Sequence, residues 1–200
     1  MAMRNPELRR RIALEAARLM SEHGLRDAYA ARRKAAARLG GYPESALPEL
    51  RDIEETLREH QRLFQADDQP RYLDELRRAA CGAMRYFARF HPRLVGAVLD
   101  GTADAHSSVC LHVFSESPES VLTLLAEDGI SFAEDSRRLW NNVDDVDDYP
   151  VVRITRDGIV FDLTVLPEDA IRQAPLVRGS QRRLRRATLA EVERLLASAA

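Results

Sequence analysis

Cysteine is scarce in this 200-residue sequence, and Cys81 and Cys110 form neither a disulfide framework nor a zinc-ligand spacing. No apolar stretch is longer than residues 94–99, which is far too short to span a bilayer. The first residues also show no apolar signal region behind their charges. These absences predict a cytoplasmic protein in a reducing compartment, with no membrane partner.

An excess of one charge sign is also missing, because 30 basic residues face 32 acidic ones for a net charge of −2. No overall field therefore recruits nucleic acid. One local run, residues 178–186, contains arginines and no acid, and arginines can pair with phosphates. Its basic members are Arg178, Arg182, Arg183, Arg185 and Arg186. Nucleic-acid contact through this run and an ordinary solvated surface are both open interpretations, since no aromatic residues alternate with the arginines.

The residues that are present suit a folded protein, since 45% are hydrophobic and 31% are charged. Helical spacing of apolar residues predicts helices over residues 9–23, over 27–39, and from Pro48 onward. Residues 66–70, with two aspartates and a proline, are expected to form a linker. We therefore expect an N-terminal helical segment over residues 1–66.

The pattern changes after this linker. We expect a helix over residues 72–90, strands over 93–99 and 108–114, and a helix from Ser117 to Gly129. A further strand over 130–133 and an acidic loop that includes residues 144–148 should follow. Residues 151–155 and 159–165 flank Asp157-Gly158, which is typical of a β-hairpin with a tight turn. A capping box at Thr188 predicts the last helix.

These elements predict an α+β fold, in which the N-terminal helical segment precedes a mixed sheet of four or five strands flanked by helices. The α+β domain is expected over residues 70–178. The basic stretch and the last helix should occupy residues 179–200.

The segment from the helix over 72–90 to the strand over 159–165 resembles the core of the nucleotidyltransferase superfamily. In that family a strand ends in Gly-Ser, a second strand carries Asp-x-Asp, and a later strand supplies a third acid. Here Gly101 and Thr102 follow the strand over 93–99, and Ser108 and Cys110 stand at the Asp-x-Asp positions. Asp162 matches the third acid. The resemblance covers roughly residues 75–166 and implies a nucleotidyltransferase-like fold.

The resemblance implies catalysis with two magnesium ions held by carboxylates. A serine hydroxyl and a cysteine thiol are poor magnesium ligands, so Ser108 and Cys110 indicate that the ordinary metal centre is lost. Asp162 would be the remnant catalytic acid. Gly101 and Thr102 could still offer backbone N–H groups to a phosphate, although an ordinary turn between two strands fits these residues equally well.

Two weaker candidates have simpler explanations. His112 lies on the same face of its predicted strand as Cys110, but a half-buried histidine fits better than a zinc ligand, since no further ligands follow at a suitable spacing. The acidic residues 144–148 lack the glycine and the distal glutamate of a calcium loop, which favours a solvated loop.

The favoured function is therefore a divergent, catalytically impaired nucleotidyltransferase-like protein. It would bind a nucleotide, another phosphorylated ligand or a macromolecule, and Gly101, Thr102, Ser108 and Cys110 are the expected ligand-binding residues. One alternative is a helical interaction module, which could form a homodimer and has no small-molecule site. Another is an active transferase that uses magnesium with displaced metal ligands. No other cofactor is expected.

Overall fold

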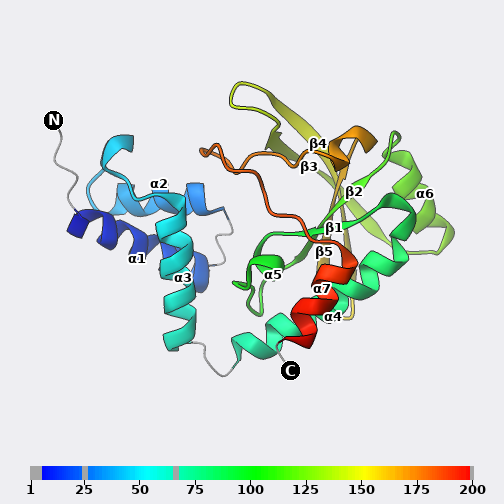
Figure 1. Ribbon diagram of the computed structural model, residues 1–200, viewed down its shortest axis with the longest axis horizontal. Coiled ribbons are helices and arrows are strands. Elements are labelled where there is room, and N and C mark those ends of the chain that lie inside the picture. Colours follow the sequence, from blue (N-terminus) through cyan, green and yellow to red (C-terminus); the bar gives the residue numbers. More distant parts are fainter. Residues whose placement is uncertain (1–5, 24–26, 65–67, 199–200) are drawn as a thin grey trace. The chain divides into compact units, whose positions relative to one another are not determined.

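The computed structural model describes residues 6–23, 27–64 and 68–198. The chain divides into two compact units, residues 1–70 and residues 71–200 (Figure 1). The second unit includes the C-terminal basic stretch and the last helix. Over the described ranges, no helix combines the length and the apolar character that crossing a membrane requires.

The first unit contains three α-helices. They are α1 (Pro6–His23), α2 (Ala28–Arg38) and α3 (Leu50–Phe64), with the short 3₁₀ helix η1 (Glu44–Ala46) before α3. The Asp27 carboxylate caps α2 by accepting hydrogen bonds from the backbone N–H groups of Tyr29 and Ala30. Ile12, Leu19 and Ile53 are fully buried in the unit. The three predicted helices are thus confirmed, with small shifts at their ends.

Helix α4 (Gln69–Tyr86) belongs to the second unit except for its first two residues, which lie inside the predicted linker. Residues 66 and 67 of that linker are outside the described residues. The following elements are η2 (Ala88–Phe90), β1 (Arg93–Val95), α5 (Ala97–Asp100), β2 (Val109–Phe114), α6 (Glu119–Glu127), β3 (Phe132–Trp140), β4 (Val146–Arg156), β5 (Ile159–Leu166), η3 (Glu168–Ile171) and α7 (Leu189–Ala197). The predicted α+β fold, with N-terminal helices before a mixed sheet, is confirmed.

The five strands form one sheet in the order β1-β2-β5-β4-β3. Only β2 and β5 run parallel, and all other neighbours are antiparallel. The β4–β5 hairpin turns at Asp157 and Gly158, as the sequence predicts. Both residues have positive φ angles, 52° and 78°. A two-residue turn with two positive φ angles has a backbone twist that matches the twist of the flanking strands.

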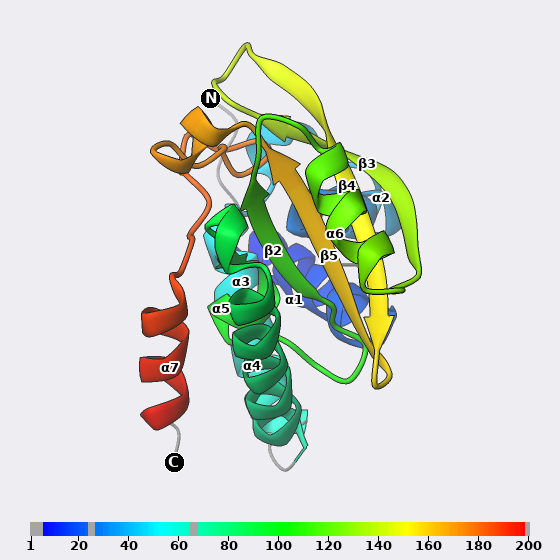
Figure 2. The same cartoon turned by 90° about the vertical axis from the view of Figure 1, so that its right-hand side faces the viewer.

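The two faces of the sheet differ in chemistry. Helices α4 and α6 lie together in front of the sheet in Figure 2, and they bury the apolar side chains of that face. The core there includes Met84, Leu94, Leu111, Leu125 and Leu163. The opposite face, called here the polar face, carries Arg93, Cys110, His112, Asp135, Arg137, Asp147, Arg153, Asp162 and Thr164.

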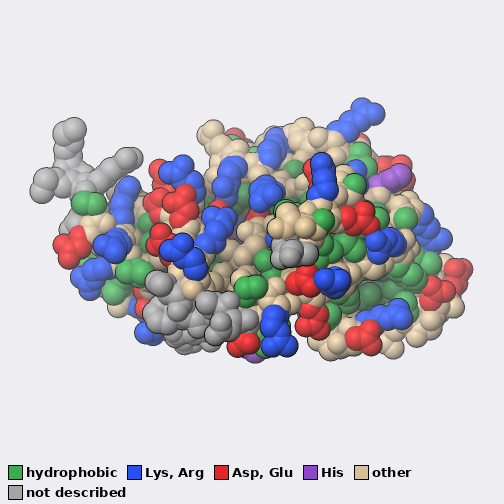
Figure 3. Space-filling view, turned by 60° about the horizontal axis from the view of Figure 1, so that its bottom comes forward, with side chains coloured by type: hydrophobic (Ala, Val, Ile, Leu, Met, Phe, Trp, Pro, Cys, Tyr) green, Lys and Arg blue, Asp and Glu red, His purple; other side chains and the backbone are tan. Residues whose placement is uncertain are grey.

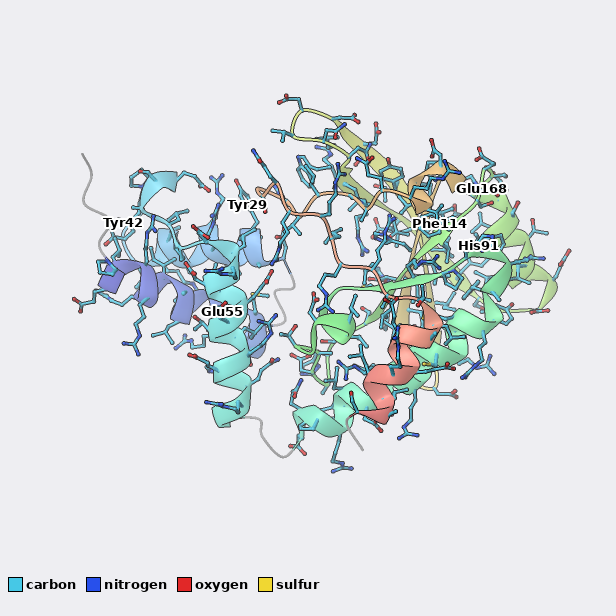
Figure 4. All side chains as sticks on the ribbon, in the orientation of Figure 1. Tyr29, Tyr42, Glu55, His91, Phe114 and Glu168 are labelled. Atoms are coloured by element: carbon cyan, nitrogen blue, oxygen red, sulfur yellow. The ribbon has the colours of Figure 1, made fainter. Side chains whose placement is uncertain are left out.

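A small apolar cluster closes one end of the polar face. Phe114, Leu139 and Leu166 pack there with Ala170 and Ile171. Figure 4 labels Phe114 and Glu168 at this end of the sheet, where η3 follows β5. Cys110 and Asp162 lie toward the other end of the parallel strands β2 and β5.

Two predicted elements are wrong in extent. The strand expected over residues 93–99 ends at Val95, because Gly96 adopts a φ angle of 73° and the chain then turns into α5. The expected acidic loop lies largely in strands, since β3 runs to Trp140 and β4 begins at Val146. Edge strand β3 is mostly exposed on both faces, so its sequence carries no apolar alternation.

Candidate functional site

The structure brings together the three positions that the resemblance connects. On the parallel strands β2 and β5, Cys110 lies directly opposite Asp162. Ser108 immediately precedes β2 and is buried. A cysteine therefore stands opposite the Asp162 carboxylate, where β2 and β5 meet in the sheet, and the buried serine lies two residues before the cysteine.

The Asp162 carboxylate is held by two arginines, one from the adjacent strand β4 and one from β3, the next strand beyond it. Arg153 of β4 donates from Nε to Oδ1 at 2.9 Å, and Arg137 of β3 donates from Nη2 to Oδ2 at 3.3 Å. Arg137 also donates to the hydroxyl of Thr164 at 3.1 Å, and Arg153 lies 3.6 Å from a carboxylate oxygen of Asp135. The hydrogen bond that Arg153 donates to the Asp162 carboxylate raises the pKa of Arg153. The Asp162 side chain is only 6% exposed, so its carboxylate is largely withdrawn from solvent.

This arrangement does not fit a magnesium ion. Magnesium prefers several oxygen ligands and carboxylates to balance its charge. Asp162 is the only carboxylate among the three aligned positions, and two guanidinium groups already neutralise it. Within the part of the chain that the structure describes, no group of three or more His, Cys, Asp or Glu side chains could hold a metal ion.

A second network on the polar face joins His112 and Arg186. Arg186 donates from Nε to His112 Nδ1 at 3.1 Å and from Nη1 to the carbonyl of Ala170 at 2.7 Å. Its guanidinium also stacks 5.0 Å from the centre of the Phe114 ring. Burial, followed by the charges of Arg186 and Arg137, lowers the pKa of His112 to about 3, so this histidine is neutral. Burial and Arg93 lower the pKa of Arg186 to about 10.

The sequence analysis missed this second network. Strand alternation places His112 on the correct face, but Arg186 lies 74 positions further along the chain and belongs to the basic stretch. An isolated antiparallel bridge between Leu94 and Ala187 brings Arg186 to the sheet. No sequence signal indicates that pairing.

Other arginines of the basic stretch are also engaged within the unit. Arg183 donates to the carbonyls of Asn141 and Ala174, each at 2.8 Å, and Arg185 pairs with Asp100 at 3.3 Å. Arg178 stacks on Trp140 at 5.2 Å. These contacts tie the stretch to the sheet unit. Arg186, through its contacts with His112 and Ala170, is part of the fold rather than a surface group available to nucleic acid.

The Gly101-Thr102 turn has a different role from the expected one. The N–H groups of Gly101 and Thr102 both donate to the carbonyl of Ala97, where they cap the C-terminus of α5. These two amides are directed into the turn, not toward a ligand. The glycine that directly follows β1 is Gly96, five residues earlier.

The polar face carries more positive than negative charge. Four guanidinium groups, those of Arg93, Arg137, Arg153 and Arg186, accompany the carboxylates of Asp135, Asp147 and Asp162. Four positive charges against three negative ones leave an excess of one, since His112 is neutral. Such a surface attracts anions.

Comparisons of the sequence with protein-family models and with curated proteins find no match.

Proposed function

We propose that residues 71–200 form a nucleotidyltransferase-like domain that has lost metal-dependent transfer and binds a phosphorylated ligand, such as a nucleotide, on its polar face. The neighbouring positions of Cys110 and Asp162 support the proposed relationship, because a metal centre built from two strands requires those strands to be adjacent. The glycine that follows β1 supports it as well.

The observation that carries the proposal is the pairing of Asp162 with Arg137 and Arg153. A carboxylate that must hold Mg²⁺ would be turned toward the cation, whereas Asp162 balances two guanidinium groups. Loss of the metal centre therefore accompanies a gain of positive charge at the same place.

Phosphate suits this surface for geometric reasons. Each guanidinium has five N–H donors in a planar fork, which is more than the oxygens of Asp162 accept. The side chains of Arg137 and Arg153 are 33% and 44% exposed, so both reach solvent while their inner ends contact Asp162. Phosphate oxygens can accept bidentate hydrogen bonds from such forks.

Calorimetric titration with a nucleoside triphosphate, with and without Mg²⁺, tests the proposal on the full chain. We expect binding that does not require Mg²⁺. Arg153→Gln should weaken it about tenfold, because one charge-assisted hydrogen bond contributes about 1.5 kcal/mol. Arg138→Gln is the matched control, since Arg138 lies on the same strand as Arg137 but pairs with exposed Asp148 on the other face.

Asp162→Asn separates the proposed site from a metal centre. Removing the carboxylate releases two guanidinium groups, so Mg²⁺-independent binding should tighten. If binding requires Mg²⁺ and is lost in Asp162→Asn, the chain is an active transferase with displaced ligands. If wild type binds no phosphorylated ligand, the helical interaction module becomes the better hypothesis. Light scattering of the full chain would then test for a homodimer.

A further inference from the structure

The helix-covered side of the sheet contains a cavity that the proposed function does not use. It has a volume of about 380 Å³ and lies between α4 and the β4–β5 hairpin. Ile154, Ile159 and Phe161 line it from the hairpin, and α4 lines it with Ala79, Gly82 and Ala83. Since Phe161 and Asp162 are consecutive on β5, they point to opposite faces, and the cavity is separate from the polar face. Figure 3, in which the bottom of Figure 1 comes forward, shows hydrophobic side chains exposed among charged ones on that face of the molecule.

Small residues on α4 keep the cavity open. Gly82 lies inside the helix, where glycine costs roughly 0.5–1 kcal/mol relative to alanine. Nothing in the packing requires it, because a β-carbon added at Gly82 would meet no atom within 4 Å. Larger side chains on this face of α4 would fill the space and bury more apolar surface.

The polar groups at the rim pair with each other. The Tyr86 hydroxyl donates to Asp128 Oδ2 at 2.6 Å, and Arg156 lies 3.8 Å from the carboxylate of Asp157. Burial, together with the hydrogen bond to Asp128, raises the pKa of Tyr86 to about 12, so its hydroxyl stays neutral. The two rim charges in the lining cancel. A charged ligand would lose its hydration here, and no uncompensated opposite charge in the lining would replace it.

The geometry points to a second binding site, between α4 and the β4–β5 hairpin, for a small uncharged apolar molecule. Its volume equals that of about a dozen water molecules, at about 30 Å³ each, and lies in the usual range of ligand pockets. An aliphatic or aromatic alcohol with a hydrocarbon body has this chemistry: the body contacts the isoleucines and Phe161, and its hydroxyl remains at the polar rim.

Calorimetric titration of the full chain with octan-1-ol tests this inference, and octanoate is the charged probe of equal length. We expect octan-1-ol to bind at least tenfold more tightly than octanoate. Gly82→Leu places a side chain in the cavity and should weaken octan-1-ol binding at least tenfold. Arg78→Leu adds a leucine at an exposed position of the same helix, where the arginine pairs with Asp74, and it should bind like wild type.

Ala79→Leu provides a second filled cavity if Gly82→Leu does not fold, and it should weaken octan-1-ol binding in the same way. The inference is overturned if wild type does not bind octan-1-ol, or if octanoate binds equally well. Binding that is unchanged in both filled variants would also overturn it, because octan-1-ol would then occupy another part of the surface.

Discussion

Replacing Asp162 with asparagine tests the central interpretation of the polar face, because it changes one charge and almost no volume. The wild-type carboxylate is 6% exposed and accepts hydrogen bonds from Arg153 at 2.9 Å and from Arg137 at 3.3 Å. An amide oxygen can keep only part of this pattern, and its NH₂ group faces donors. Both guanidinium groups lose the charge of Asp162, although Arg153 keeps the carboxylate of Asp135 at 3.6 Å.

The expected cost follows from burial. Removing one partner of a fully buried ion pair costs about 3–5 kcal/mol. The two arginine side chains are 33% and 44% exposed, so water can solvate them partly after the substitution. We therefore expect Asp162→Asn to lower the free energy of unfolding by about 2 kcal/mol, even though it tightens phosphate binding.

Urea unfolding measures this change in the second unit. The single tryptophan, Trp140, lies in β3, so its fluorescence follows the sheet. With a urea dependence of about 2 kcal/mol per molar, the midpoint should fall by about 1 M. Asp148→Asn, which removes an exposed partner of Arg138, should leave the midpoint nearly unchanged. The reasoning is refuted if both variants unfold at the wild-type midpoint.

Two further predictions concern His112 and the glycines of the second unit. The folded chain keeps His112 neutral down to a pKa of about 3, whereas the unfolded chain protonates it near pH 6.5. Burial of the neutral His112 therefore stabilises the fold fully above pH 6.5. As the pH falls from 6.5 toward 3, the free energy of unfolding decreases by about 1.4 kcal/mol per pH unit. Urea titrations at several pH values should show a shallower loss for His112→Gln; equal slopes would contradict the assignment. Gly158→Ala, at a φ angle of 78°, should destabilise the hairpin by about 1 kcal/mol, whereas Gly82→Ala, in helical conformation, should stabilise α4 by about 0.5 kcal/mol. Thermal unfolding of both variants would test this contrast, and changes of the same sign would refute it.

The predictions for stability and for ligand binding at Asp162 have opposite signs. If Asp162 only supported the fold, its replacement would lower the stability without improving the affinity for phosphate. If Asp162 were a metal ligand, its replacement would lower the affinity for a metal-bound nucleotide. Measuring both quantities on Asp162→Asn therefore distinguishes three roles for the same side chain.

Local patterns in the sequence determined most of the secondary structure. The spacing of apolar residues was sufficient for α1–α4 and α6, because each helix buries one stripe against its own unit. Asp157-Gly158 specified the hairpin, since few residue pairs accept two positive φ angles. The capping box at Thr188 correctly placed the start of α7. Each of these signals acts over a few residues, which is why sequence reasoning could identify it.

Only the tertiary structure decided which charges meet. Asp162 was a candidate from the sequence, but Arg137 and Arg153 reach it from β3 and β4 because the sheet order is β1-β2-β5-β4-β3. The extent of β3 was also undetermined, since an exposed edge strand needs no apolar alternation. Arg186 lies 74 positions from His112 along the chain and reaches it because an isolated bridge pairs Ala187 with Leu94. Long-range pairing depends on register and sheet order, which no short sequence pattern encodes.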